Sequence, residues 1–174
     1  MSYSFDNVSV LLAEDIRMMQ DLTCYALGCL GIKNVLRADN GEAAYELYRA
    51  HSPDIIICDW QMAPVNGLEL VKMIRQDKTS IMRTVPIIML TGYASESYVM
   101  EARDAGVNEF LVKPFTAESL AGRLASVIER PKSYIETATY FGPDRRRKNP
   151  RMIYNGPMRR AEDHDASERW SVEF

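Results

Sequence analysis

The chain has 174 residues, of which 47% are apolar, and its formal net charge is −3. That length allows one domain of ordinary size with its own core and a short extra segment. All apolar runs are shorter than the about 20 residues that cross a membrane, and the start lacks the basic and apolar regions of a signal peptide. We therefore expect a cytoplasmic protein without membrane insertion. The three cysteines form no CxxC pair and lie within apolar segments, which argues against disulfides and a zinc site.

Short apolar runs alternate with segments of helical periodicity before residue 130. The runs predict strands at residues 8–13, 34–38, 54–59, 85–91 and 109–113. The first, third and fourth runs are almost continuously apolar, which is typical of central parallel strands with helices on both faces. We therefore predict an α/β fold, a doubly wound (βα)5 domain with a five-stranded parallel sheet, over residues 6–130.

Polar side chains stand where the first, third, fourth and fifth of these runs end. They are Glu14 and Asp15, then Asp59, Thr91 and Lys113. In an open α/β sheet, ligands gather at the carboxyl ends of the strands, so we expect these side chains to converge on one edge. Two like charges about 4 Å apart repel by about 4 kcal/mol at an effective dielectric constant of about 20, so cations must hold the carboxylates together. Lys113 is one such cation, and Mg²⁺ suits a site with few carboxylates better than Ca²⁺ does.

The predicted cluster has the parts that phosphoryl transfer requires. The metal ion and Lys113 would neutralise phosphate oxygens, and Thr91 would donate a hydrogen bond to one of them. Asp59, which follows a buried apolar run, would then act as the nucleophile. Each residue also has an ordinary structural interpretation, such as acids in a solvated turn, an aspartate that caps a helix, or a surface lysine. The ordered placement of all of them favours phosphoryl transfer.

Two other classes of protein share parts of this pattern. Aspartyl phosphatases of the haloacid dehalogenase type also place a nucleophilic aspartate at a strand end. They need a second aspartate two residues later, where this chain has Gln61, so turnover of an outside substrate is not expected. A flavin-binding module would need a phosphate-cradling loop rich in Ser, Thr and Gly after the first strand. The chain reads AEDIRMM at that place, which argues against a flavin-binding module.

The segments LLAED, DIIICDWQM, IIMLTG and FLVKPF resemble the receiver domain of two-component response regulators, at the family's usual spacings over residues 6–130. The resemblance implies the flavodoxin-like strand order 2-1-3-4-5. It also implies that Asp59 is the phosphoacceptor, and that Glu14 and Asp15 are the acidic pair around Mg²⁺, with the backbone carbonyl of Gln61 as a further ligand. The phosphoryl donor would be a histidine kinase or a phosphotransfer protein. The output would be phosphorylation-dependent binding to a downstream protein that the sequence does not identify.

By the same resemblance, Thr91 and Lys113 sense the phosphoryl group, and the Lys113–Pro114 bond is cis. Phe110 stands where the family carries a switch aromatic that turns inward on activation. The chain departs from the family at two of these points. Pro64 stands one place later than the usual proline, so we expect the loop after the third strand to run differently. Phe110 lacks the hydroxyl that a tyrosine would contribute to an inward state.

Residues 131–174 differ from the rest of the chain in charge and pattern. Residues 1–130 hold 12 basic and 17 acidic side chains, a balance of −5, whereas residues 131–174 hold 9 and 7, a balance of +2. Periodicity stops, and the segments YFGPDRRR (140–147) and YNGPMRRA (154–161) repeat the pattern Y-x-G-P-x-R-R. The repeated residues are Tyr140, Gly142, Pro143 and Arg145, followed by Tyr154, Gly156, Pro157 and Arg159.

The composition of this tail is compatible with a solvated, disordered segment. The repeat favours a second interpretation, in which the tyrosines and Gly-Pro turns dock as two equivalent elements on this protein or on a second copy, with possible self-association. The arginines allow a third interpretation, in which the protein is a regulator that binds nucleic acid through its tail. The tail has no helix-turn-helix, zinc or winged-helix pattern to support it. No output domain is recognised. We expect a receiver domain that acts by binding, without catalysis of an outside reaction, and an irregular C-terminal tail.

Overall fold

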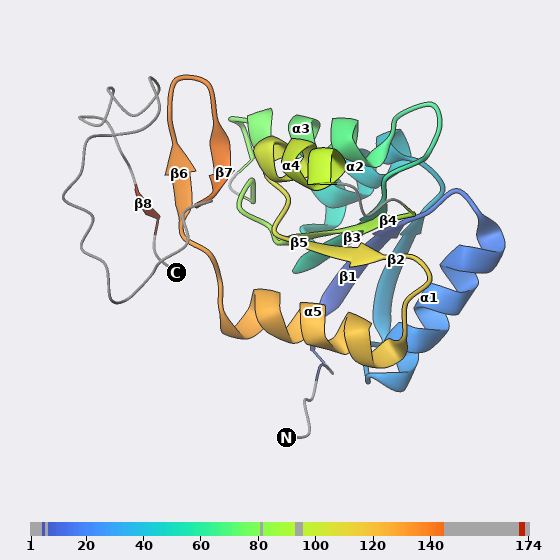
Figure 1. Ribbon diagram of the computed structural model, residues 1–174. Coiled ribbons are helices and arrows are strands. Elements are labelled where there is room, and N and C mark those ends of the chain that lie inside the picture. The colour runs from blue at the N-terminus through green and yellow to red at the C-terminus, as the bar shows by residue number, and fades with distance from the viewer. Residues whose placement is uncertain (1–4, 6, 81, 93–95, 145–170, 173–174) are drawn as a thin grey trace.

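The computed structural model describes residues 5, 7–80, 82–92, 96–144 and 171–172 of the chain. Strands and helices alternate as β1 (Ser9–Ala13), α1 (Arg17–Cys29), β2 (Asn34–Ala38), α2 (Gly41–His51), β3 (Ile55–Asp59), α3 (Gly67–Gln76), β4 (Ile87–Thr91), α4 (Glu96–Ala105), β5 (Glu109–Val112) and α5 (Ala117–Glu129). Five strands form one parallel sheet in the order β2-β1-β3-β4-β5. Helices α2, α3 and α4 cover one face, and α1 and α5 cover the other (Figure 1). The predicted α/β class and strand order are confirmed.

The central strands supply the core on both faces of the sheet. Every residue of β3 and β4 is buried, whereas the edge strands β2 and β5 each include exposed positions. Successive side chains of a strand point to opposite faces, so Leu11 and Ile56 belong to one apolar cluster while Leu12 and Ile57 belong to the other. No helix among the described residues is long and apolar enough to span a membrane.

The predicted strand at 85–91 is two residues longer than β4, which begins at Ile87. Pro86 has no N–H to donate to a neighbouring strand, so it stands before the ladder while its carbonyl accepts from the Ile56 amide at 2.9 Å. The predicted bounds of β1, β3 and β5 differ from the observed ones by one residue at one end, which is within the usual uncertainty of element ends.

A second, antiparallel sheet follows α5. Its strands are β6 (Tyr134–Glu136), β7 (Phe141–Pro143) and β8 (Ser171–Val172), in the order β7-β6-β8. Strands this short carry no detectable periodicity, so they were not predicted, and the segment expected to be an irregular tail contains a short hairpin. The β6–β7 hairpin packs closely on the turn after α4, because a Cβ on Gly142 would lie 3.0 Å from the Cα of Gly106.

Candidate functional site

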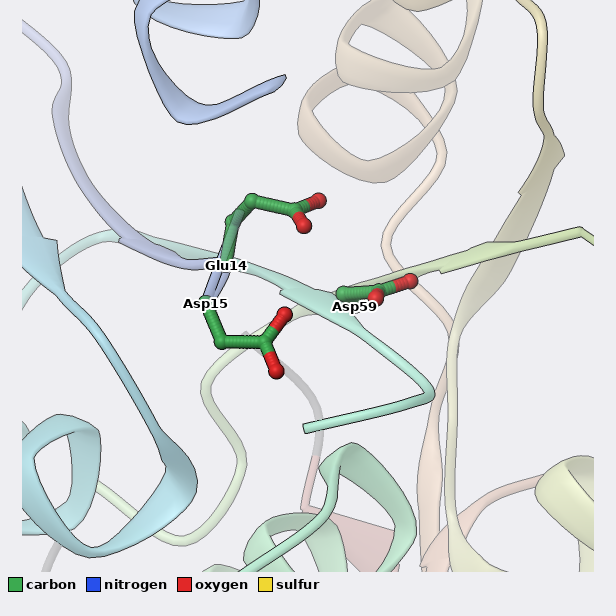
Figure 2. A group of neighbouring side chains, drawn as sticks. All are labelled: Glu14, Asp15 and Asp59. Carbon is green, nitrogen blue, oxygen red and sulfur yellow. The ribbon is translucent and has the colours of Figure 1, made fainter. Parts of the chain in front are cut away.

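Three carboxylates gather where β1 and β3 end. Glu14 and Asp15 follow β1, and Asp59 is the last residue of β3, its neighbour in the sheet. Ligand oxygens of the three side chains lie within 4.8 Å of one another (Figure 2). Glu14 is fully buried and Asp59 is 5% exposed, whereas Asp15 is exposed. The carboxyl edge of the sheet therefore holds three carboxylates, two of them largely removed from water.

Lys113 contacts both of the buried carboxylates. Its Nζ lies 2.6 Å from Glu14 Oε2 and 2.9 Å from Asp59 Oδ1. Lys113 comes directly after β5, and its backbone amide donates to the carbonyl of Thr91 at 2.8 Å, which fixes its place beside the end of β4. One lysine thus bridges acids from two other strands.

The charges of this cluster are not balanced by the protein alone. Burial raises the pKa of Glu14 and of Asp59 above their ordinary values, and hydrogen bonds from Lys113 only partly oppose that effect. Burial lowers the pKa of Lys113, but its bonds to the two carboxylates outweigh burial and leave the pKa raised. Three carboxylates against one ammonium leave an excess of negative charge, and oxygen ligands of this kind suit a hard divalent cation such as Mg²⁺. The donor set therefore fits that ion.

The loop after Asp59 is held by close backbone contacts. The Trp60 amide donates to the carbonyl of Leu90, and the Gly67 amide donates to the carbonyl of Trp60 at 3.0 Å. A Cβ on Gly67 would lie 2.1 Å from the carbonyl oxygen of Asp59, so only glycine fits where α3 begins. The side chain of Asn66 caps this helix, which excludes the interpretation of Asp59 as a helix cap.

The other residues predicted for this site lie nearby but differ in exposure. Thr91 ends β4 and is 2% exposed, and Gln61 is exposed in the loop after β3. Phe110, in β5, is half-buried against the apolar cluster beneath α2, α3 and α4. The Lys113–Pro114 bond is cis, and so is the Ala63–Pro64 bond in the loop after β3.

Sequence reasoning missed a supporting residue, Gln20 of α1. Its Nε2 donates to the backbone carbonyls of Glu14 and Ala38, at 3.2 Å and 3.1 Å, and so joins the ends of β1 and β2. Gln20 lies three and seven residues before Thr23 and Leu27, on the buried side of its helix. A polar residue on an apolar stripe was the available signal, since buried amides need partners.

The tail residues divide into two groups. Tyr140, Gly142 and Pro143 of the first repeat lie in or beside the β6–β7 hairpin, where the Tyr140 hydroxyl donates to the carbonyl of Pro143 at 2.9 Å. Arg145 and the whole second repeat, with Tyr154, Gly156, Pro157 and Arg159, lie outside the described residues. The hairpin contacts residues just before β4 and β5, at the end of the sheet opposite the carboxylates.

Residues 10–125 match the family described as the response regulator receiver domain. The chain belongs to this family. The receiver domain is 34% identical over 124 residues to chemotaxis protein CheY-3 of Vibrio cholerae, covering 71% of this chain and 94% of that protein. It is 37% identical over 122 residues to chemotaxis protein CheY1 of Helicobacter pylori, covering 70% of this chain and 97% of that protein. Receiver domains of this kind are phosphorylatable switches of two-component signalling.

Solved structures agree with this assignment. The structure of CheY4 from Vibrio cholerae is similar with a TM-score of 0.65 and 30% identity, and covers 70% of this chain and 98% of that one. A response regulator of Chloroflexus aurantiacus gives the same TM-score and identity, over 71% of this chain and 100% of that one. The similarity spans the receiver domain, and the hairpin after α5 lies beyond the matched residues 10–125.

Proposed function

We propose that this receiver domain is a switch that accepts a phosphoryl group on Asp59 from a histidine kinase or a phosphotransfer protein, and that it signals by phosphorylation-dependent binding. The observation that supports this role is the position of the Asp59 carboxylate. It is 5% exposed, bonded to Lys113 at 2.9 Å, and within 4.8 Å of the ligand oxygens of Glu14 and Asp15. Asp59 is the carboxylate that β3 directs into the cluster.

The transfer step uses a carboxylate oxygen of Asp59 as the nucleophile. It attacks the phosphorus of a phosphohistidine, an acyl phosphate bond forms, the P–N bond breaks, and the leaving imidazole nitrogen takes a proton. Lys113 holds Oδ1 and so fixes the orientation of the carboxylate before the attack. Hydrolysis by water later returns the free carboxylate and inorganic phosphate, so the chemistry stays on the protein's own aspartate.

We propose that Glu14, Asp15, Asp59 and the backbone carbonyl of Gln61 hold Mg²⁺ at this site. When bound, the ion supplies positive charge for the three carboxylates and for the phosphate oxygens. The chain's own contribution is to keep these oxygens together. Gln20 fixes the backbone of Glu14, and the close contact at Gly67 fixes that of Asp59.

Thr91 and Lys113 are proposed to sense the phosphoryl group. Thr91 ends β4 beside Asp59, and Lys113 bridges Asp59 and Glu14, so a phosphate on Asp59 competes with these carboxylates for the ammonium. A shift of Lys113 acts directly on β5, which also carries Phe110. Phe110 is proposed as the switch side chain, through packing alone because it has no hydroxyl.

The test is phosphorylation by acetyl phosphate with Mg²⁺, followed by intact mass. The wild type is expected to gain one phosphoryl group, Asp59→Asn none, and EDTA is expected to abolish the gain. Asp54→Asn is the matched control, because Asp54 lies just before β3, at its other end, where it accepts hydrogen bonds from Ser9. Undiminished phosphorylation of the Asp59→Asn protein would overturn the assignment.

A further inference from the structure

A mainly apolar cavity of about 260 Å³ lies beneath β6, between the start of β4 and the end of α5. Its apolar lining includes Met82, Val85, Pro86, Val127, Pro131 and Tyr134. Lys132 and Tyr134, which lie two residues apart, both face it. The side of the β6 strand that faces the domain is therefore the side of these two residues.

β7 pairs with one edge of β6, and β8, which comes much later in the chain, pairs with the other edge. The pairing is antiparallel and sets Tyr134 opposite Val172 and Ile135 opposite Ser171. Side chains of directly opposite residues lie on the same face of a sheet. The register thus places position 172 opposite Tyr134, the residue of β6 that lines the cavity.

The sequence around β8 reads Trp170-Ser171-Val172-Glu173-Phe174, with apolar and polar residues in strict alternation. Continuing the register of β8 by two residues would set Phe174 opposite Lys132, on the side of the cavity. The same continuation would leave Glu173 on the outer side. Pattern and register agree, because a continued register would assign the apolar positions to the side of the domain and the polar ones to solvent.

From this agreement we propose that the β6 edge and the cavity form a docking site for a strand of alternating apolar residues, and that its occupant is residues 170–174 of the same chain. Val172 and Phe174 cover the cavity. A two-stranded hairpin is only marginally stable in water, and a third strand removes the exposed edge of β6. Residues 170–174 occupy the site of their own chain, rather than that of a second copy, because a tethered segment has a high effective concentration at its site.

The register is tested by disulfide trapping in the full-length chain, with Cys24 and Cys29 replaced by Ser. Lys132→Cys with Phe174→Cys is expected to form an intramolecular disulfide under mild oxidation, because directly opposite positions in a sheet are close enough for one. Lys132→Cys with Glu173→Cys is the matched control, shifted by one residue to the other face, and should cross-link about tenfold more slowly or less. Equal rates in the two pairs overturn the proposed register, and a disulfide between two chains overturns a docking site filled in cis.

Hydrogen exchange of residues 134–136 tests the occupant independently. Val172→Asp is expected to speed their exchange by about tenfold, because a carboxylate cannot be buried over an apolar cavity. Glu173→Ala changes the outer face of the same strand and should leave exchange unchanged. If Val172→Asp exchanges like the wild type, residues 170–174 do not dock there. Tyr134 of β6 contacts the residues just before β4 and β5, at the end of the sheet opposite Asp59, so phosphorylation by acetyl phosphate reports separately on the proposed function.

Discussion

The ring of Tyr134 lies against the guanidinium of Arg75, with the guanidinium carbon 5.2 Å from the ring centroid and both side chains buried. Arg75 donates to the carbonyl of Gly106 at 3.1 Å, to Asn108 Oδ1 at 3.0 Å and to the carbonyl of Arg83. Asn108 in turn donates to the Tyr134 hydroxyl at 3.0 Å. Burial lowers the pKa of Arg75, and the acceptors of its hydrogen bonds among the described residues are neutral carbonyl and amide oxygens. This network attaches the hairpin after α5 to the receiver domain.

The hydroxyl of Tyr134 is expected to stabilise the whole domain. Tyr134→Phe keeps the ring over Arg75 but leaves the amide of Asn108 without this acceptor, so the free energy of unfolding should fall by about 1–2 kcal/mol. Denaturant unfolding measures the change. Tyr25→Phe is the control, because Tyr25 is 75% exposed, and its effect should stay within about 0.5 kcal/mol. An effect of Tyr134→Phe no larger than that of Tyr25→Phe would show that the hairpin is not anchored through this network.

The contrast between this network and the carboxylate cluster explains what the sequence could predict. Asp59 and Lys113 each follow an apolar run, and parallel topology brings the ends of such runs to one edge. The convergence of these residues therefore follows from order along the chain alone. The loop after β3 was harder to predict, because its course depends on the fit between Gly67 and the backbone of Asp59, which no periodicity encodes.

Arg75 could not have been placed in the same way. It lies four residues after Val71 on the buried side of α3, where a cation is costly without partners. Its acceptors stand 8, 31 and 33 residues away in sequence, so only the tertiary fold identifies them. The hairpin was missed for a related reason, since Tyr134 contacts Arg75 of α3 across the tertiary fold and no pattern within residues 134–143 indicates that contact.

Gly67 is expected to be essential for the geometry at Asp59. In Gly67→Ala, the new Cβ would lie 2.1 Å from the carbonyl oxygen of Asp59 and 3.0 Å from its carbonyl carbon, so the backbone of β3 or α3 must move. We expect a loss of about 1–3 kcal/mol in the free energy of unfolding, as for other overpacked sites, and slower phosphorylation by acetyl phosphate.

Gly28→Ala is the matched control for Gly67→Ala. Apart from its chain neighbours and the backbone of its own helix, a Cβ at Gly28 would meet no atom within 4 Å, and Gly28 lies inside α1. Alanine is the better helix former, so this variant should gain up to about 1 kcal/mol and phosphorylate normally. Equal stabilities of the two alanine variants would contradict the steric argument.

Asp59→Asn is expected to stabilise the protein in the absence of Mg²⁺. Burial raises the pKa of Asp59, so the folded state binds its proton more tightly than the unfolded state does. The stability linked to that proton is complete below the unfolded pKa and is lost as pH rises through the folded pKa. At about pH 7 the free energy of unfolding of the variant should therefore be about 0.5–2 kcal/mol higher than that of the wild type.

The pH dependence of this difference in the free energy of unfolding tests whether it arises from the charge of Asp59. The advantage of Asp59→Asn should shrink as the pH falls from about 7 through the raised pKa of the wild-type carboxyl, and should shrink again when Mg²⁺ binds the wild type. Asp54→Asn should show no such gain, because Asp54 accepts hydrogen bonds from the amide and hydroxyl of Ser9. A difference in stability that is constant across this pH range would contradict the electrostatic origin.

Lys113→Ala is expected to separate ion binding from the response to phosphorylation. Removing the ammonium makes the cluster more negative, so Mg²⁺ should still bind, which a titration followed by tryptophan emission measures because Trp60 adjoins Asp59. The link from Asp59 to β5 runs through the Lys113 ammonium at 2.9 Å, and that link is lost. Amide shifts on phosphorylation should then remain near Asp59 and no longer reach β5 and α4.

The control is Lys72→Ala, which removes an exposed lysine of α3 and should leave the shifts of the wild type unchanged. Lys113→Ala also leaves the fully buried Glu14 without its cation, so unfolding must be measured beside the shifts. If the variant is folded and phosphorylated, and its shifts in β5 and α4 match those of the wild type, Lys113 does not carry the signal. The response must then travel from Asp59 through β4 and Thr91, whose carbonyl accepts from the Lys113 backbone whatever side chain stands there.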